Sequence, residues 1–469
     1  MTKQKETIEM TSVDGGWAEA ELAGIDLGDK RLTSRLIRVA EDFANQPEVP
    51  INHASKDWAA TKAAYRLFGN ANVTDKKLFG VHQKRTQERL LGEKVVLAIQ
   101  DTTYLNYDDH DSCKGLGFIG TEELKGVIAH HTLMVTPNGL PLGLLTQELT
   151  TRTKLKRLNQ GERRKLPIKK KESFRWIRAL RKTTELARAT ERTVVTVCDR
   201  ECDIFEFMHE AQVLGAPYVV RSCDNRNVAD DDFDKLQILL RNQPAVGTFE
   251  LTIPSRNGKK GRTAELEIRF AEITLPVSKN LRKYSYSAIT VWAVMTTEKN
   301  PADPNDAMEW ILLTNLPVSS CDEAVERLRW YQMRWQIEIF HKILKSGCNV
   351  EDCRLETIKR LKTYLSLFSV IAWRIFYCTH ICRTAPNAPA STILSTVEIE
   401  ALSMLAGKKD KTRKTINTVK VAVVEIAKLG GFLARRHDGF PGPTSIWRGF
   451  RKLANATEMW EITQALKCG

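Results

Sequence analysis

Two apolar stretches rich in β-branched residues constrain the fold most strongly, because each runs directly into an aspartate. KVVLAIQ (residues 94–100) precedes Asp101, and RTVVTVC (residues 192–198) precedes Asp199. Continuous apolar runs of this length are typical of central strands that are buried on both faces of a sheet. Ligands of open α/β sheets bind at the carboxyl ends of such strands. The sequence therefore predicts a pair of site carboxylates, although a single aspartate after a strand can also be ordinary turn chemistry.

A third carboxylate lies in a helix that we predict for Leu328 to Gly347. With about 3.6 residues per turn, the polar residues of this segment fall within about 100° of arc on one side of the helix. They are Tyr331, Arg334, Glu338, His341, Lys342 and Lys345. The apolar residues Met333, Ile339, Phe340, Ile343 and Leu344 fall on the other side. Glu338 could form an i,i+4 pair with Lys342 on a solvated face, or it could join the two aspartates.

The order of the other segments predicts an α/β core between two helical regions. Residues 1–90 show helical spacing, and the chain is helical again after Gly347. The stretch around Pro137-Asn138-Gly139 predicts a β-hairpin, and residues 223–308 alternate like an antiparallel β region inserted into the core. We therefore expect three domains: a helical domain (1–90), a mixed-sheet domain (91–375, insertion at about 223–308) and a helical C-terminal domain (376–469).

The charge of the chain indicates a polyanionic partner. The 469 residues carry a net charge of +14, and the sequence pI is about 9.2. Residues 152–182 concentrate 14 Lys or Arg against two Glu, a density that neutralises phosphates. Nucleic acid is the common partner of such a protein. A membrane surface is a weaker alternative, because no long basic amphipathic anchor stands out. We also expect no apolar leader and no membrane span, since no run approaches eighteen apolar residues.

The ten cysteines do not predict a zinc site, because they are scattered and never form paired CxxC motifs. We expect reduced thiols that serve as small apolar side chains. The three carboxylates predict a different metal centre. Two strand-end aspartates and a helical glutamate can hold two divalent cations about 3.5–4 Å apart, which activate water for phosphodiester cleavage. A set of oxygen ligands favours Mg²⁺, with Mn²⁺ as an alternative.

These residues resemble a known family. Asp101, Asp199 and Glu338 resemble the catalytic triad of bacterial insertion-sequence DDE transposases, which have a ribonuclease H-like core. The resemblance is to the cut-and-paste branch with the Y-R-E-K signature, whose spacing is matched by Tyr331, Arg334, Glu338 and Lys345. The DRExD element is matched from Asp199 to Asp203. The departures are mild: AYRLF replaces AYRF, and Cys202 fills the variable position of DRExD.

The resemblance implies a role for each site residue. Asp101, Asp199 and Glu338 would hold two Mg²⁺ ions, and Trp310 would receive a base flipped out of the duplex. The implied DNA contacts are Tyr331, Arg334, Lys345 and Arg221, together with Arg35 and Arg66 at the transposon ends. His341 and Lys342 are further candidates for DNA contact, or they only complete the polar side of the predicted helix. The C-terminal LGGF element and its tryptophan-containing tail resemble the dimerisation region of the family.

The implied function is DNA transposition. The enzyme would nick the transposon ends, form and reopen a DNA hairpin, and join the 3′-hydroxyl ends to target DNA. It would act as a homodimer in a synaptic complex with double-stranded DNA, in the bacterial cytoplasm or on the nucleoid, with no membrane partner. Two alternatives stay open at this point. One is a DNA-binding protein without catalysis, and the other is a ribonuclease H-like nuclease or resolvase that only hydrolyses DNA.

Overall fold

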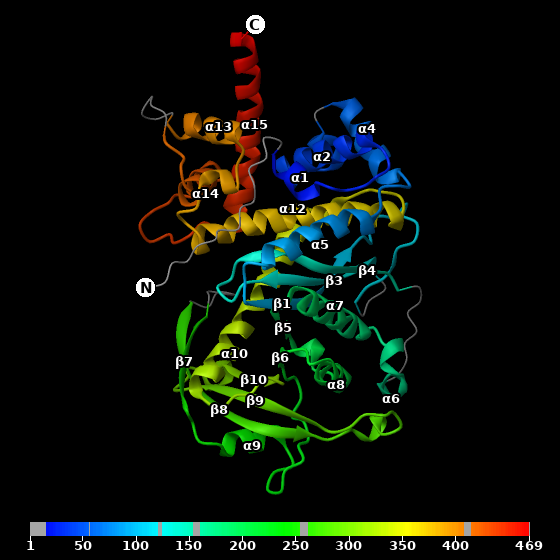
Figure 1. The fold of residues 1–469 in the computed structure, drawn as a ribbon, viewed down its shortest axis with the longest axis vertical. Helices are drawn as coiled ribbons and strands as arrows, with labels where there is room; N and C mark the ends of the chain where they lie inside the picture. Colours follow the sequence, from blue (N-terminus) through cyan, green and yellow to red (C-terminus); the bar gives the residue numbers. More distant parts are fainter. Residues whose placement is uncertain are drawn as a thin grey trace. The chain divides into compact units, whose positions relative to one another are not determined.

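The computed structural model describes residues 16–55, 57–120, 124–152, 160–253, 261–407 and 414–468, and Figure 1 gives their elements. The chain folds into two compact units. Unit 1 comprises Met1–Glu93, Thr102–Leu155 and Gln336–Gly469, and unit 2 comprises Lys94–Asp101 and Lys156–Trp335. The chain therefore passes from one unit to the other four times, after Glu93, Asp101, Leu155 and Trp335.

Unit 2 is built on a mixed sheet. β1 (Val95–Asn106) pairs in parallel with β5 (Thr193–Cys198), and β5 pairs in parallel with β6 (Tyr218–Arg221). β10 (Glu309–Thr314) runs antiparallel to β6 and continues the sheet. The antiparallel strands expected within residues 223–308 are present as β9 (Ile289–Glu298), β8 (Arg262–Leu275) and β7 (Gly247–Ile253), which follow β10 in that order.

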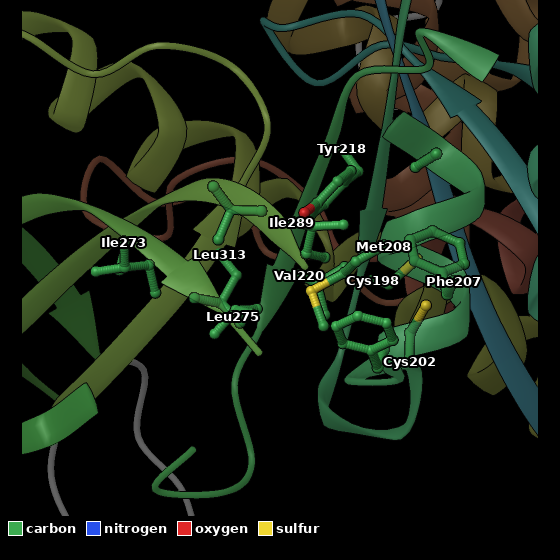
Figure 2. Packing of buried hydrophobic residues seen from close by; sticks show 14 of the residues in the cluster. Cys198, Cys202, Phe207, Met208, Tyr218, Val220, Ile273, Leu275, Ile289 and Leu313 are labelled. Atoms are coloured by element: carbon green, nitrogen blue, oxygen red, sulfur yellow. The ribbon is translucent and has the colours of Figure 1, made fainter. Parts of the chain in front are cut away.

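The core of unit 2 forms where apolar strand residues meet the helices of the same unit. These helices are α7 (Phe174–Thr190), α8 (Phe205–Leu214), α9 (Leu236–Asn242) and α10 (Cys321–Met333). Figure 2 shows Phe207 and Met208 of α8 close to Tyr218 and Val220 of β6. Cys198 and Cys202 are fully buried in this cluster as free thiols, as the sequence predicted. Burial of this apolar surface fixes β5 and β6, and with them the residues that follow each strand.

Unit 1 contains the predicted hairpin and most of the helices. β3 (Lys125–Val135) and β4 (Pro141–Thr150) are antiparallel around a turn in which Gly139 has a φ of 93°. β2 (Gly117–Phe118) pairs with β3. The N-terminal helices are α1 (Gly16–Leu22), α2 (Lys30–Asn45), α3 (Ile51–Ala54), α4 (Trp58–Gly69) and α5 (Asp75–Leu90). The C-terminal helices are α12 (Ile358–Thr384), α13 (Thr396–Ala406), α14 (Val419–Leu429) and α15 (Pro443–Cys468).

The central element of unit 1 is α12, which packs against α5 and β4 (Figure 1). Among the described residues it is the one helix long and apolar enough to cross a membrane. The whole apolar window of α12 is buried inside the protein, as expected for a core helix. Its apolar character is therefore explained by packing on all sides.

Two sequence predictions about local structure were wrong in detail. β1 does not end at Asp101 but continues to Asn106. The buried run stops at Gln100 because the next four side chains, Asp101 to Tyr104, are half-buried, while the backbone remains extended. The helix predicted for Leu328 to Gly347 is also interrupted. The prediction missed the interruption because it assumed a uniform helical twist.

The interruption has two parts. α10 ends at Met333, and the Arg334 N–H donates to the Tyr331 carbonyl at 3.0 Å in a tight turn. α11 (Trp335–Lys342) follows and runs into a π-helical turn, η5 (Ile343–Gly347), which the Cys348 N–H closes on the Ile343 carbonyl at 2.8 Å. Tight and wide turns rotate the residues after them away from the ideal phase, and π-turns often occur at functional sites.

Candidate active site

Two carboxylates of unit 2 share one level of the sheet. In the β1–β5 pairing, Val95 lies opposite Thr193 and Ile99 lies opposite Val197. Each partner is 98 positions further along the chain, and the pairing ends at Ile99 and Val197. The same offset continued for two residues would set Asp101 of β1 level with Asp199, which directly follows β5. Neighbouring strands lie about 4.8 Å apart, and residues in register point to the same face of the sheet. The offset therefore points Asp101, on β1, and Asp199, in the turn after β5, to one level of the sheet.

Asp199 is held by the turn that follows its strand. It caps the short helix η2 (Arg200–Cys202), and its Oδ1 accepts a hydrogen bond from the Glu201 N–H at 2.9 Å. Burial raises the pKa of the neighbouring Cys198 thiol, and the negative charges of Asp199 and Asp101 raise it further. The positive charge of Arg334 lowers the same pKa. The charges of the two aspartates and of Arg334 therefore all act on the Cys198 thiol in unit 2.

Asp203 lies in the turn before α8 but does not cap that helix, because the residue that precedes α8 is Ile204. Its Oδ1 accepts two hydrogen bonds from Arg226, at 2.9 and 2.6 Å. Its Oδ2 accepts hydrogen bonds from the Cys223 N–H and the Ser222 hydroxyl at 2.8 and 3.1 Å. A buried carboxylate with this many donors is fully satisfied. Asp203 thus ties the DRExD turn to the loop that directly follows Arg221.

Arginines and aromatic rings gather beside β6 and β10 in unit 2. The Trp310 ring lies 5.2 Å from the Tyr331 ring at an angle of 75°, and the Arg221 guanidinium lies 6.0 Å from the Trp310 ring. Arg221 also donates to the Glu309 carbonyl at 3.2 Å, and Arg334 lies 5.9 Å from the Tyr331 ring. These contacts bring together four of the residues that the sequence singled out.

Like charges crowd this cluster. Burial lowers the pKa of Arg221, Tyr331 raises it through its charge and a hydrogen bond, and the positive charges of Arg200 and Arg334 lower it. Three guanidiniums so close to one another favour binding of a polyanion. Sequence reasoning did not assign Arg200 to this cluster. The available signal was its place next to Asp199 in the DRExD element.

Glu338 belongs to unit 1, where it lies half-buried in the first turn of α11. A carboxylate is favoured there by the positive end of the helix dipole. His341, one turn further on, is buried with its Nε2 3.1 Å from Nδ1 of His131 on β3. The Phe340 ring packs edge-on against His131 at 5.2 Å. Sequence reasoning did not foresee that a β3 histidine meets His341, because the two lie 210 positions apart.

The two lysines of this segment differ in environment. Lys345 donates to the Tyr104 carbonyl of β1 at 3.0 Å and pairs with Glu351 at 3.3 Å, while a third of its side chain stays exposed. Lys342 is exposed on α11. The remaining predicted DNA contacts, Arg35 on α2 and Arg66 on α4, are also exposed. Solvent-facing cations of this kind are available for phosphate contacts.

Three family models match the chain. The transposase DNA-binding model matches residues 14–73, the transposase DDE domain model matches residues 175–373, and the Tn5 transposase dimerisation domain model matches residues 370–465. The chain belongs to the insertion-sequence DDE transposases. Its α/β core with a mixed sheet is therefore ribonuclease H-like, flanked by N- and C-terminal helical regions. The transposase has a DNA-binding domain and a dimerisation domain, so DNA and a second copy of the chain are its partners.

The predicted site residues fall within these domains with one exception. Asp199 and Glu338 lie in the matched DDE domain, and Arg35 and Arg66 lie in the matched DNA-binding domain. Asp101 precedes the matched DDE residues and is connected to them by the β1–β5 register.

DDE transposases depend on a divalent metal. In the part of the chain that the structure describes, no three His, Cys, Asp or Glu side chains form a ready cluster around one point. The chemistry of the donors nevertheless fits such an ion, because Asp101 and Asp199 share one sheet level and offer only carboxylate oxygens. Hard divalent cations prefer these ligands.

Proposed function

We propose that this transposase cuts DNA at the ends of its own element by metal-dependent phosphoryl transfer and joins the freed 3′-hydroxyl ends to target DNA. The register that aligns Asp101 with Asp199 is the single observation that supports this proposal most strongly. A noncatalytic DNA-binding protein needs no pair of carboxylates at one level of the sheet. A purely hydrolytic nuclease needs no dimerisation domain.

Asp101, Asp199 and Glu338 would be the metal ligands of the site. Two Mg²⁺ ions held there, or Mn²⁺ in their place, would supply Lewis-acid chemistry for the attacking and leaving oxygens. Glu338 would come from α11, the helix in which the chain passes from unit 2 to unit 1. Arg334 and Glu338 are four positions apart along the chain.

The arginine-rich cluster would hold the DNA beside the cut. Tyr331, Arg334 and Lys345, in Y-R-E-K spacing, would grip phosphates, and Arg221 would contact the strand next to them. Trp310 would stack a base that leaves the duplex, a step that exposes the backbone for hairpin formation. The freed 3′-hydroxyl would attack the opposite strand, a second hydrolysis would reopen the hairpin, and the same hydroxyl would then attack target DNA. Arg35 and Arg66 would contact the recognised ends, and Lys342 and His341 would complete the cationic face.

The assembly would be a homodimer that pairs two ends in a synaptic complex within the bacterial cytoplasm. The domains would be an end-binding domain (1–90), a catalytic domain (91–375, insertion at about 223–308) and a dimerisation domain (376–469). End binding and DNA cleavage would then depend on different domains, so a substitution could abolish one activity and leave the other.

The test is a cleavage assay with full-length protein, Mg²⁺ and DNA that carries the inverted ends of its own element. A gel would resolve nicks, hairpins and joined products. Glu338→Ala should abolish all three while end binding, measured without metal, is retained. The control is Glu326→Ala, which removes an exposed carboxylate from α10 and should leave cleavage unchanged. Cleavage by Glu338→Ala at the rate of the unmodified protein would refute the triad.

A further inference from the structure

A group of exposed cations in unit 2 has no part in the proposed active site. Lys165 ends α6 (Gln160–Lys165), Lys169 and Lys170 lie in η1 (Ile168–Lys170), and Arg282 and Lys283 follow η3 (Lys279–Leu281). We call these five residues the lysine face. We propose that the lysine face binds the phosphate backbone of a duplex without reading its sequence, namely DNA that lies outside the recognised transposon end. The inference deepens the proposed function and rests on it.

The lysine face is assembled by the fold from two distant segments. Lys283 Nζ donates to the Lys165 carbonyl at 3.1 Å, and the Tyr284 hydroxyl donates to the same carbonyl at 3.5 Å, across 118 and 119 positions of the chain. The segment between β8 and β9 accordingly lies near α6 in Figure 1. A run of charge that only solvates a surface needs no such bridge. Here a lysine and a tyrosine fix the relative position of two cationic segments.

The neighbouring carboxylates are already matched by other cations. Glu206 pairs with Lys171 at 3.3 Å, and Glu210 pairs with Arg181 at 2.7 Å. Within the described residues, Lys169, Lys170 and Arg282 have no ion pair, and all three are exposed. These three cations are therefore available to phosphates, as required for a surface that releases counterions from DNA.

Two aromatic rings lie beside the lysine face, and one of them, that of Tyr284, contacts a cation of the face itself. The Phe174 ring lies 5.1 Å from the Arg178 guanidinium and 5.6 Å from that of Arg181, and the Lys283 ammonium lies 5.0 Å from the Tyr284 ring. Such contacts reduce the side-chain entropy that a phosphate contact would otherwise cost. Lysines act as point charges without a fixed bonding pattern, so they hold a backbone and do not read bases. A transposase must hold a second stretch of duplex in addition to the end that it recognises. That stretch is either flanking donor DNA or target DNA, and both offer the same phosphates.

The first experiment measures binding of a random-sequence duplex to full-length protein without metal, as a function of salt. Lys169→Gln/Lys170→Gln and Lys169→Gln/Lys283→Gln should each reduce the slope of log K against log salt by about 1.8, since each phosphate contact contributes about 0.9. The matched control is Lys182→Gln/Arg188→Gln, which removes two exposed charges from the C-terminal half of α7. An unchanged slope in both test variants, or an equal loss in the control, would overturn the proposal.

A second experiment separates the two sources of DNA. In one arm the variants receive an uncut end with its flank, and in the other a precut end with a separate target duplex. Slower cleavage in the first arm alone assigns the face to flanking DNA, and fewer joined products in the second arm alone assign it to target DNA. Normal yields in both arms would contradict a role in transposition. The salt slope of duplex binding is measured without metal, so it does not depend on cleavage. Failure of the proposed cleavage chemistry can therefore be distinguished from failure of the lysine face to bind DNA.

Discussion

Nε2 of His341 lies 3.1 Å from Nδ1 of His131, and both imidazoles are buried in unit 1. A hydrogen bond between two imidazole nitrogens needs one donor and one acceptor, so both rings can be neutral only in complementary tautomers. Burial lowers the pKa of His131 to about 3, and burial together with the charge of His131 lowers the pKa of His341 well below its usual value. The pair connects α11, which carries Glu338, to β3.

The histidine pair predicts a loss of stability in mild acid. In the unfolded chain both residues bind protons near pH 6.5, whereas in the folded protein they do not until much lower pH. Stability is therefore complete above pH 6.5 and falls as the pH drops towards 3, by at most about 1.4 kcal/mol per pH unit for each histidine. Thermal unfolding between pH 7.5 and 5 should show this fall, and His131→Asn/His341→Asn should reduce it. His437→Asn, a change at an exposed histidine, is the control.

Glu41 on α2 should show the opposite dependence. Burial and the nearby charges of Asp42 and Glu398 raise its pKa to about 7. The folded state then binds more protons than the unfolded chain between pH 4.5 and 7, so stability falls as the pH rises through this window. Glu41→Gln should stabilise the protein at pH 8 by about 1–2 kcal/mol, after discounting for partial exposure. Unfolding in urea at pH 5 and pH 8 provides the measurement. Glu185→Gln, at an exposed carboxylate of unit 2, should change neither value.

Lys345 offers a test of the phosphate grip. Lys345→Ala should weaken binding of the transposon end and reduce its salt slope by about 0.9, the contribution of one phosphate contact. The same change removes the hydrogen bond to the Tyr104 carbonyl, so thermal stability must be measured in parallel. Glu351→Gln breaks the Lys345 ion pair without removing the cation and should leave the salt slope intact. A lower melting temperature with an unchanged slope for Lys345→Ala would limit this lysine to a structural role.

Trp310 should be needed more for hairpin formation than for the first nick. Stacking of a base on an aromatic side chain contributes about 1–3 kcal/mol, so Trp310→Ala should slow hairpin formation roughly 5- to 150-fold. Trp310→Phe keeps a ring against Tyr331 and should retain part of the rate. A fluorescent adenine analogue beside the cut would report the flipped base directly. Equal slowing of nicking and hairpin formation would argue against stacking, and Trp330→Phe, a nearby buried tryptophan, controls for general damage.

The structural elements that could be predicted were those set by residues close together in the sequence. The β-branched runs identified β1 and β5, and Pro137-Asn138-Gly139 identified the β3–β4 turn. Strand propensity and turn geometry act over a few residues, so a single sequence contains them in full. The same local patterns drew attention to Asp101, Asp199 and Glu338 as candidate ligands.

By itself the sequence determined which residues are candidates, because residue type and local spacing specify the available chemistry. Only the tertiary structure decided which of them meet. Strand pairing, set by burial of both sheet faces, brings Asp101 level with Asp199. Asp203 finds Arg226 across 23 positions, and His341 finds His131 across 210. The tight turn at Arg334 and the π-turn after Lys342 also escaped prediction, since packing of the whole chain, and not local propensity, sets the twist of a buried helix.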